Sequence, residues 1–206
     1  VIKLSENKVI NLTAQVPVKR TNDGVMIIFY RSSTAKAKDL FSLYLHHLIV
    51  QCWQSQQSGA TDYQANMLSE VCGSRGFYFN TKAQKVEQYF IDSLDNEQEQ
   101  LTCAANQSLV ELLRCYFKGQ QQPLLINGDI AAQVFKQTRG KRVEMTAERF
   151  ELYWQGTESS RGLGDDLYMQ YFWPQCPDIN EHLAEIESIY QGLYQLVEKV
   201  KSGSKA

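Results

Sequence analysis

Residues 14–17 and 29–31 are the part of this sequence where two neighbouring strands could hold a divalent metal ion. The first stretch is Ala-Gln-Val-Pro and the second is Phe-Tyr-Arg. Metal-dependent cleavage of a phosphodiester requires two or more carboxylates that converge on a hard cation, with a base or a cation near the attacking water. At pH 7 neither Gln15 nor Tyr30 supplies a negatively charged oxygen. The sequence therefore predicts no catalytic residue, no metal site and no cofactor at these strands.

Acidic residues elsewhere keep a second hypothesis open, in which a working nuclease takes its metal ligands from displaced positions. Residues 6–8 are Glu-Asn-Lys and have the acid-x-lysine spacing of such sites. They fall in an expected turn, however, and no carboxylate lies on an adjacent strand, so solvated turn residues are the simpler interpretation. The acids that this hypothesis would use are Glu6, Glu70 and Asp92.

Cysteine and histidine spacing gives no sign of a zinc site or of nucleophilic catalysis. No two of the five cysteines have C-x-x-C spacing, and the chain has only three histidines. His46 and His47 are adjacent, so on a helix their side chains diverge by about 100° and cannot share one ion without distortion. The sequence also lacks the G-x-S-x-G and G-x-x-x-x-G-K-[ST] motifs of serine hydrolases and nucleotide hydrolases.

Two basic clusters and one aromatic segment are the remaining candidates for binding. Each basic cluster could contact phosphate or an acidic partner, and a solvated loop is the alternative for both. The aromatic segment could be core, a docking edge or a stacking platform for bases. The candidate DNA or partner contacts are Arg31, Lys36, Lys38, Arg139, Lys141 and Arg142. The candidate docking residues for a partner subunit are Tyr168, Tyr171, Phe172 and Trp173.

The composition is that of a soluble globular protein. The 206 residues are 43% hydrophobic and 21% charged, with no apolar run long enough to span a membrane. The formal net charge of −2 excludes binding of nucleic acid mainly by the overall field of the chain. Any DNA contact is therefore expected to be local or arranged by partner subunits. An odd number of cysteines and no signal segment favour the reducing cytoplasm.

The order of expected elements predicts an α+β fold, with a sheet in the first part and a mainly helical second half. Alternating apolar residues and the turn at residues 21–24 favour an antiparallel meander over the first 32 residues. We expect a nuclease-like sheet with its core helix over 1–93 and a helical portion over 94–206 packed on it, together in one structural domain. Because residues 1–4 resemble a strand already under way, we also expect a fragment of a longer chain. The expected strands are 1–4, 8–18, 25–30, 77–79 and 86–91. The expected helices are 35–54, one that starts at 95–97 and runs to 118, 128–138, 144–155 and 178–201.

Four stretches in this order resemble a known family. They are LTAQVPVKRTNDGVMIIFYRSSTAKAKDLFSLYLHHLI, PLLINGDIAAQVF, LYWQG and DDLYMQYFW. Together they are similar to the C-terminal domain of the exodeoxyribonuclease V gamma subunit, RecC. The most specific parts are the Arg31-Ser32-Ser33 junction before the first helix and the late Asp-x-Tyr-x-x-Tyr-Phe-Trp pattern.

The resemblance implies a restriction-endonuclease-like (PD-(D/E)XK-type) sheet flanked by helices that has lost its metal-binding acids. The degenerate positions would be Gln15, Val16, Tyr30 and Arg31. The implied role is a non-catalytic structural and DNA-guiding domain of the RecBCD-type helicase–nuclease, an ATP-dependent exodeoxyribonuclease that acts in the repair of double-strand breaks. The implied partners are the beta and alpha subunits, with DNA inside the complex and no membrane. A stand-alone interaction module unrelated to that complex is the third hypothesis.

Overall fold

The computed structural model forms two compact units, which we describe separately. The sheet unit comprises Val1–Tyr116 with Gly192–Ala206, and the helical unit comprises Phe117–Gln191. The domain boundary predicted at residue 93 stays a prediction. Within the described residues, no helix is long and apolar enough to cross a bilayer. The structure describes residues 1–56, 67–92, 98–138 and 141–200, with the backbone alone for 98–103.

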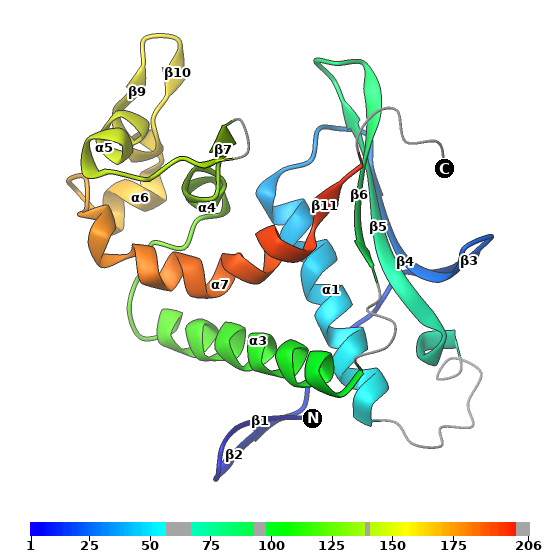
Figure 1. Cartoon of the computed structure of the whole chain (residues 1–206). Coiled ribbons are helices and arrows are strands. Elements are labelled where there is room, and N and C mark those ends of the chain that lie inside the picture. Colours follow the sequence, from blue (N-terminus) through cyan, green and yellow to red (C-terminus); the bar gives the residue numbers. More distant parts are fainter. Residues whose placement is uncertain (57–66, 93–97, 139–140, 201–206) are drawn as a thin grey trace. The chain divides into compact units, whose positions relative to one another are not determined.

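A five-stranded mixed sheet with the strand order β11-β6-β5-β4-β3 is the main element of the sheet unit (Figure 1). β4 and β5 are parallel, and the other neighbours are antiparallel. A parallel pair needs a long crossover, which here includes helix α1. The strands are β3 (Val18–Thr21), β4 (Gly24–Arg31), β5 (Val71–Asn80), β6 (Lys85–Asp92) and β11 (Glu198–Lys199).

Helix α1 (Ala37–Gln56) lies against one side of this sheet (Figure 1), which we call the inner face. His47 on α1 bonds to Ser74 on β5, and the ring of His46 meets that of Phe29 on β4 at 5.0 Å between centroids. Because successive side chains on a strand alternate, Ile28 and Tyr30 project from the opposite, outer face. The core between α1 and the sheet includes Val25, Ile27, Val50 and Val71.

Helices α3 (Gln98–Gly119) and α7 (Leu183–Leu196) follow later in the chain. A Cβ added at Gly192 of α7 would lie 2.2 Å from the hydroxyl of the buried Tyr44 on α1. Glycine therefore allows the backbone of α7 to lie directly against the ring of Tyr44. After α7 the chain adds β11 to the edge of the sheet beside β6 (Figure 1).

The meander predicted over the first 32 residues is confirmed for the β3–β4 hairpin. It is wrong for the preceding residues, which do not join the same sheet. The turn at residues 21–24 joins β3 to β4 as expected. β1 (Ile2–Ser5) pairs only with β2 (Lys8–Ile10), in a separate two-stranded sheet. Residues 11–17 form no strand, although Ile28 N–H donates to the carbonyl of Pro17 at 2.9 Å. Within this segment Val16 packs against the apolar cluster, whereas the other residues, Leu12 and Ala14 among them, are exposed.

The helical unit is built from short elements, many of which begin at a side-chain cap. Asn127, Thr146 and Asp166 accept hydrogen bonds from backbone N–H groups at the starts of α4, α5 and α6. Residues 156–161 form a tight hairpin that Gly156 enters with a φ of 75°. The described elements are α4 (Gly128–Val134), β7 (Gln137–Thr138), β8 (Lys141–Arg142), α5 (Ala147–Gln155), β9 (Gly156–Thr157), β10 (Ser160–Arg161), η1 (Leu163–Asp165), α6 (Leu167–Phe172) and η2 (Ile179–Glu181).

Two predicted helix boundaries in the later part of the chain are wrong. The helix expected over 128–138 ends at Val134, because the chain then turns into the β7–β8 hairpin. The helix expected over 178–201 begins at Leu183 and ends at Leu196. Asp178 caps the short helix η2 instead, by accepting from the N–H of Asn180.

His47 is a titratable group buried between α1 and β5. Its side chain lies 2.9 Å from the Ser74 hydroxyl through Nδ1, while Nε2 is buried with no hydrogen-bond partner. Burial lowers the pKa of His47 to about 4. An unfolded histidine takes up its proton near its ordinary value of 6.5. Between these two values the unfolded chain binds one more proton than the folded chain, so stability falls as the pH drops from 6.5 to 4.

Between pH 7.5 and about 4.5 we expect the free energy of unfolding to fall by roughly 2 kcal/mol less in His47→Gln than in the wild type. The reason is that glutamine does not titrate. The measurement is the free energy of unfolding in urea at both pH values. His46→Gln, on the adjacent and less buried histidine, is the control. If the free energy of unfolding falls equally in the wild type and in His47→Gln, this histidine does not limit stability in acid.

Candidate functional site

The end of β4 is the position at which the sequence predicts a strand framework without metal ligands. Here Phe29 and Arg31 lie on the inner face, whereas Tyr30 projects from the outer face and is 73% exposed. Val16 and Phe29 pack against the same apolar cluster, and Gln15 is exposed outside any strand. The structure therefore brings Val16, Phe29 and Arg31 to one side of the sheet, and it separates Gln15 and Tyr30 from them.

The charge of Arg31 is paired within the sheet unit. Its guanidinium donates to both oxygens of Asp39, at 2.9 and 2.8 Å. The same carboxylate accepts from the backbone N–H of Lys36 at 3.0 Å, which satisfies one donor at the start of α1. Arg31 and Asp39 thus fix the β4–α1 junction. Lys36 and Lys38 lie at the same junction with exposed side chains.

The acids proposed as displaced metal ligands are dispersed. Glu70 forms an ion pair with Arg20 at 2.7 Å, Asp92 is exposed at the end of β6, and Glu6 is exposed in the turn between β1 and β2. Among the residues that the structure describes, no three His, Cys, Asp or Glu side chains are grouped so that they could hold a metal ion. The displaced-ligand hypothesis gains no support from this arrangement.

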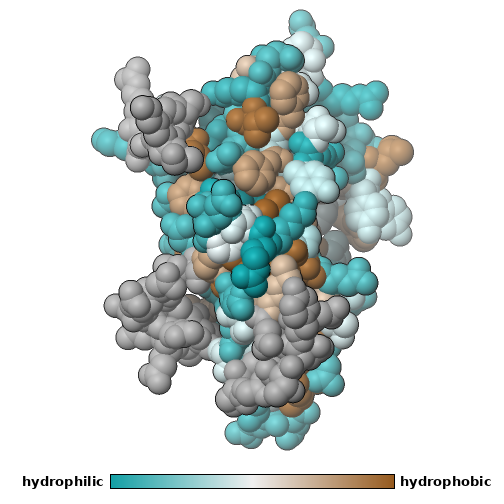
Figure 2. Space-filling model, turned by 90° about the vertical axis from the view of Figure 1, so that its right-hand side faces the viewer, coloured by the Kyte–Doolittle hydropathy of each residue, from teal (hydrophilic) through white to brown (hydrophobic). Residues whose placement is uncertain are grey.

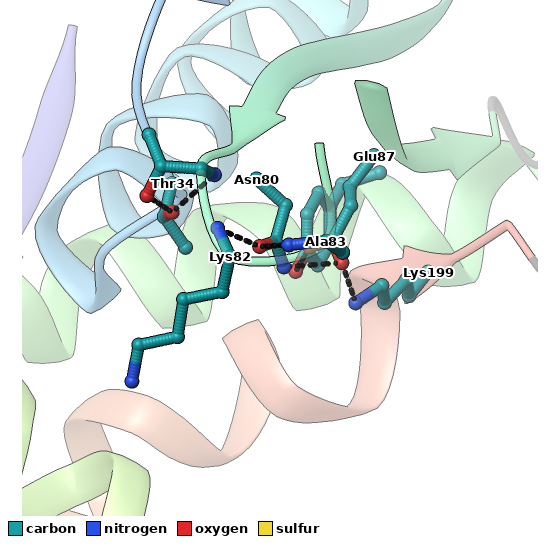
Figure 3. A network of polar contacts seen from close by, with 8 residues as sticks. Thr34, Asn80, Lys82, Ala83, Glu87 and Lys199 are labelled. Atoms are coloured by element: carbon teal, nitrogen blue, oxygen red, sulfur yellow. Dashed lines mark hydrogen bonds and ion pairs between the residues drawn. The ribbon is translucent and has the colours of Figure 1, made fainter. Parts of the chain in front are cut away.

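A polar network at the other edge of the inner face centres on Glu87 of β6 (Figure 3). This carboxylate is 7% exposed, and its Oε1 accepts from Lys199 of β11 and from Asn80 of β5, each at 2.8 Å. Tyr89 donates to the second oxygen at 3.4 Å. The network links the C-terminal strand β11 to the β5–β6 hairpin, and its donors already occupy the oxygens of Glu87.

The two charges of this network stabilise each other. The hydrogen bond from Lys199 holds the pKa of Glu87 below its usual value, although burial acts in the opposite direction. Burial tends to lower the pKa of Lys199, but the bond to Glu87 and the nearby Tyr89 raise it overall. Burial also raises the pKa of Tyr78 to about 12, with Asp39 and Tyr89 adding to the effect. The group is therefore a structural ion pair with neutral tyrosines at pH 7, rather than an acid–base centre.

Sequence reasoning missed this network, although the sequence carries a signal for it. Glu87 occupies the same alternation phase as Tyr89 and Ile91, which face α1. An acid in the buried phase of a strand requires a partner. That partner comes from residue 199, in a two-residue strand that the local pattern does not predict.

The second basic cluster lies in the helical unit, and its members are used differently. Arg142 pairs with Glu187, donates to the carbonyl of Val134 at 3.1 Å and lies over the ring of Phe135. Lys141 is exposed. Arg139 lies outside the described residues. Arg142 is thus engaged within its own unit although its side chain is 47% exposed, and Lys141 is the second exposed cation of the described pair.

The late aromatic segment forms α6 and the residue after it. Tyr168 and Tyr171 are 73% and 80% exposed, and both rings contact Phe172 edge-on. Phe172 and Trp173 are half-buried. Two half-buried rings therefore support two exposed tyrosines, which is typical of a rigid surface for binding another molecule.

We expect Lys199→Ala to detach β11 from the sheet in a fraction of molecules, because Glu87 then loses its cationic partner. Hydrogen exchange of the Val200 amide, which donates to the carbonyl of Gln88 at 2.9 Å, should accelerate roughly tenfold, equivalent to about 1.4 kcal/mol of local stability. The control is Lys82→Ala, since the side chain of Lys82 points away from Glu87 in Figure 3. Unchanged exchange at Val200 would mean that backbone pairing alone holds β11.

A known protein family matches most of the chain. Residues 2–139 match a family model described as the RecC C-terminal domain. This match includes the β4–α1 junction and the Glu87 strand. A search of curated proteins found no match.

Proposed function

We propose that this chain, which belongs to the RecC C-terminal domain family, is a non-catalytic structural and DNA-guiding domain of an exodeoxyribonuclease V complex. The family match spans residues 2–139, which is well over half of the chain. In this proposal the complex acts in recombinational repair of double-strand breaks in the cytoplasm. The domain contributes surfaces and rigidity, and hydrolysis takes place elsewhere in the complex.

The arrangement at the end of β4 is the observation that carries this proposal. A metal-dependent nuclease needs converging anionic oxygens. The inner face instead has the apolar Val16 and Phe29 packed on the core, and Arg31 neutralised by Asp39. Asp39 in turn is held by the guanidinium and by the start of α1, so its oxygens serve the fold. These contacts give the position a structural role.

We also propose that the five-stranded sheet is a restriction-endonuclease-like sheet. The hairpin β3–β4, the following helix α1 and the strand β5 parallel to β4 support this assignment. The degenerate positions would then be those on the inner face, Val16 and Arg31, rather than Gln15 and Tyr30. Alternation along β4 is the reason, because only every second residue faces the helix.

The proposed partners are the beta and alpha subunits of exodeoxyribonuclease V, with DNA in the assembled complex. The exposed tyrosines of α6 suit a subunit contact, since tyrosine is enriched in protein interfaces. Lys36, Lys38 and Lys141 are exposed cations that suit DNA phosphates. With a net charge of −2, such contacts would position DNA only in combination with the partner subunits.

The test of the non-catalytic role is a plasmid-nicking assay with Mg²⁺ or Mn²⁺. We expect the purified chain to leave supercoiled DNA intact and to give no saturable heat of Mn²⁺ binding, because the described residues contain no anionic cluster that would attract the ion. The full-length gamma chain should meanwhile co-purify with the beta and alpha subunits.

Nicking that a chelator abolishes would overturn this role. The variants Glu6→Gln, Glu70→Gln and Asp92→Asn would then identify whether displaced acids are responsible. A full-length chain that does not bind the other subunits would instead favour a stand-alone module.

We expect Tyr168→Asp combined with Tyr171→Asp to weaken subunit assembly at least tenfold, because the new carboxylates would have to be buried in the contact. Analytical ultracentrifugation of the full-length chain with its partner subunits provides the measurement. Leu152→Asp on α5 is the matched control, since this residue is 68% exposed in the same unit. Assembly at wild-type affinity in the double variant would exclude α6 from the interface.

A further inference from the structure

The outer face of the five-stranded sheet is apolar and lacks a covering layer among the described residues. Its side chains follow from the register, because Tyr30 is opposite Phe77, and Phe79 is opposite Val86. Tyr30 and Val86 are 73% and 60% exposed. The apolar residues of the outer face are Ile28, Tyr30, Phe77, Phe79, Val86 and Phe90, and the polar Gln88 lies among them opposite Phe77.

The space-filling view agrees with this assignment. Figure 2 shows the side of the molecule that lies beyond the sheet in Figure 1, and hydrophobic atoms gather in its upper middle between hydrophilic margins. In Figure 1 α1 lies on the inner side of the sheet, and no described helix of the sheet unit lies across the outer side. An apolar patch bordered by polar residues is typical of a surface that binds another protein.

Strand pairing explains why this face requires a cover. β4 and β5 are parallel, and all-parallel sheets almost always have both faces covered by helices, so the parallel part of this mixed sheet favours a cover on its second face as well. The sequence of β4 agrees, because residues 25–30 are apolar in both alternation phases. α1 covers the face that contains Val25, Ile27 and Phe29. On the other face of β4, Ile28 is half-buried and Tyr30 is exposed, and only Met26, near the start of the strand, is buried.

Charge on the outer face indicates the chemistry of the cover. Lys19 of β3 lies on this face opposite Met26, with its ammonium 5.1 Å from the centre of the Tyr30 ring. Arg75 of β5 is also on this face, paired at one end of the sheet with Asp23. The buried acid Glu87 faces inward. At the β3–β4 edge the outer face therefore carries the ammonium of Lys19, which complements a carboxylate, whereas Glu198 of β11, opposite Phe90, places an acid at the far edge of the same face.

We propose that the outer face binds an amphipathic helix of a partner subunit, with its apolar stripe on the rings and an acidic side chain near Lys19. A helix fits better than a single DNA strand, because Ile28 and Val86 are aliphatic and offer no surface on which a base can stack. The helix would complete the second layer of the sheet. This inference rests on the proposed assembly with the beta and alpha subunits, and it adds a surface distinct from α6.

The experiment uses the full-length gamma chain carrying Tyr30→Glu with Val86→Glu. Both side chains are more than half exposed, so the fold should tolerate the changes, as circular dichroism and thermal melting will verify. We expect at least tenfold weaker assembly with the beta and alpha subunits. Hydroxyl-radical labelling of Tyr30 and Phe77 should fall severalfold when the wild-type complex forms. Lys19→Glu should weaken assembly less than the Tyr30 and Val86 double variant does. It places a carboxylate next to the acidic side chain of the partner helix but leaves the apolar contact intact.

The matched control is Val9→Glu with Leu152→Glu, which adds the same charge at two residues of similar exposure, 58% and 68%. Wild-type affinity in the Tyr30 and Val86 variant, together with unchanged labelling, would overturn this inference while leaving the proposed assembly intact. Failure of the wild-type chain to assemble would overturn both.

Two further outcomes would identify a different occupant and also reject the partner helix. Labelling of Tyr30 that is equally low in the free full-length chain would assign the cover to another part of the same chain. Binding of an oligothymidine that the Tyr30 and Val86 variant loses, with assembly unaffected, would assign the face to single-stranded DNA.

Discussion

The alternation of side chains along β4 is the constraint on which both faces of the sheet depend. Once α1 packs on the face that contains Ile27, Phe29 and Arg31, the residues between them must project to the other side. The parallel pairing of β4 with β5 extends this division across the sheet, because registered partners share a face. An inner face rich in internal contacts and an outer face without a described cover both follow from that single packing choice.

Polar groups on the inner face pair with neighbours within the sheet unit, except that Nε2 of His47 is buried without a partner. His47 bonds to Ser74, Arg31 to Asp39, and Glu87 to Lys199 and Asn80. Each of these bonds connects two different elements, so each restricts how α1, β5, β6 and β11 pack. Buried polar groups cost free energy unless they are paired. Here the carboxylate oxygens of Asp39 and Glu87 accept hydrogen bonds from neighbouring side chains, so they are not available to bind a metal ion. The contacts that make the unit rigid therefore also agree with its proposed lack of catalysis.

The exposed apolar surfaces lie outside these networks and suit assembly. Rings on α6 and on the outer face are supported by half-buried aromatic neighbours, so binding would order few additional side chains. One surface belongs to the helical unit and the other to the sheet unit. A domain of a multisubunit DNA-processing complex would use such surfaces to hold partners in place, and local lysines would then contact the DNA that the assembled subunits enclose.

The sequence by itself determined the local structure: the turn at residues 21–24, the apolar strand after it, the helix α1 and the aromatic segment of α6. It also indicated the family, and the absence of acids at residues 14–17 and 29–31. Tertiary structure alone decided that Tyr30 and Arg31 lie on opposite faces relative to α1, that β1 and β2 leave the main sheet, and that Lys199 returns to Glu87. The physical reason is that alternation and propensity act between near neighbours, whereas face assignment and edge pairing depend on contacts between residues that are far apart in the chain.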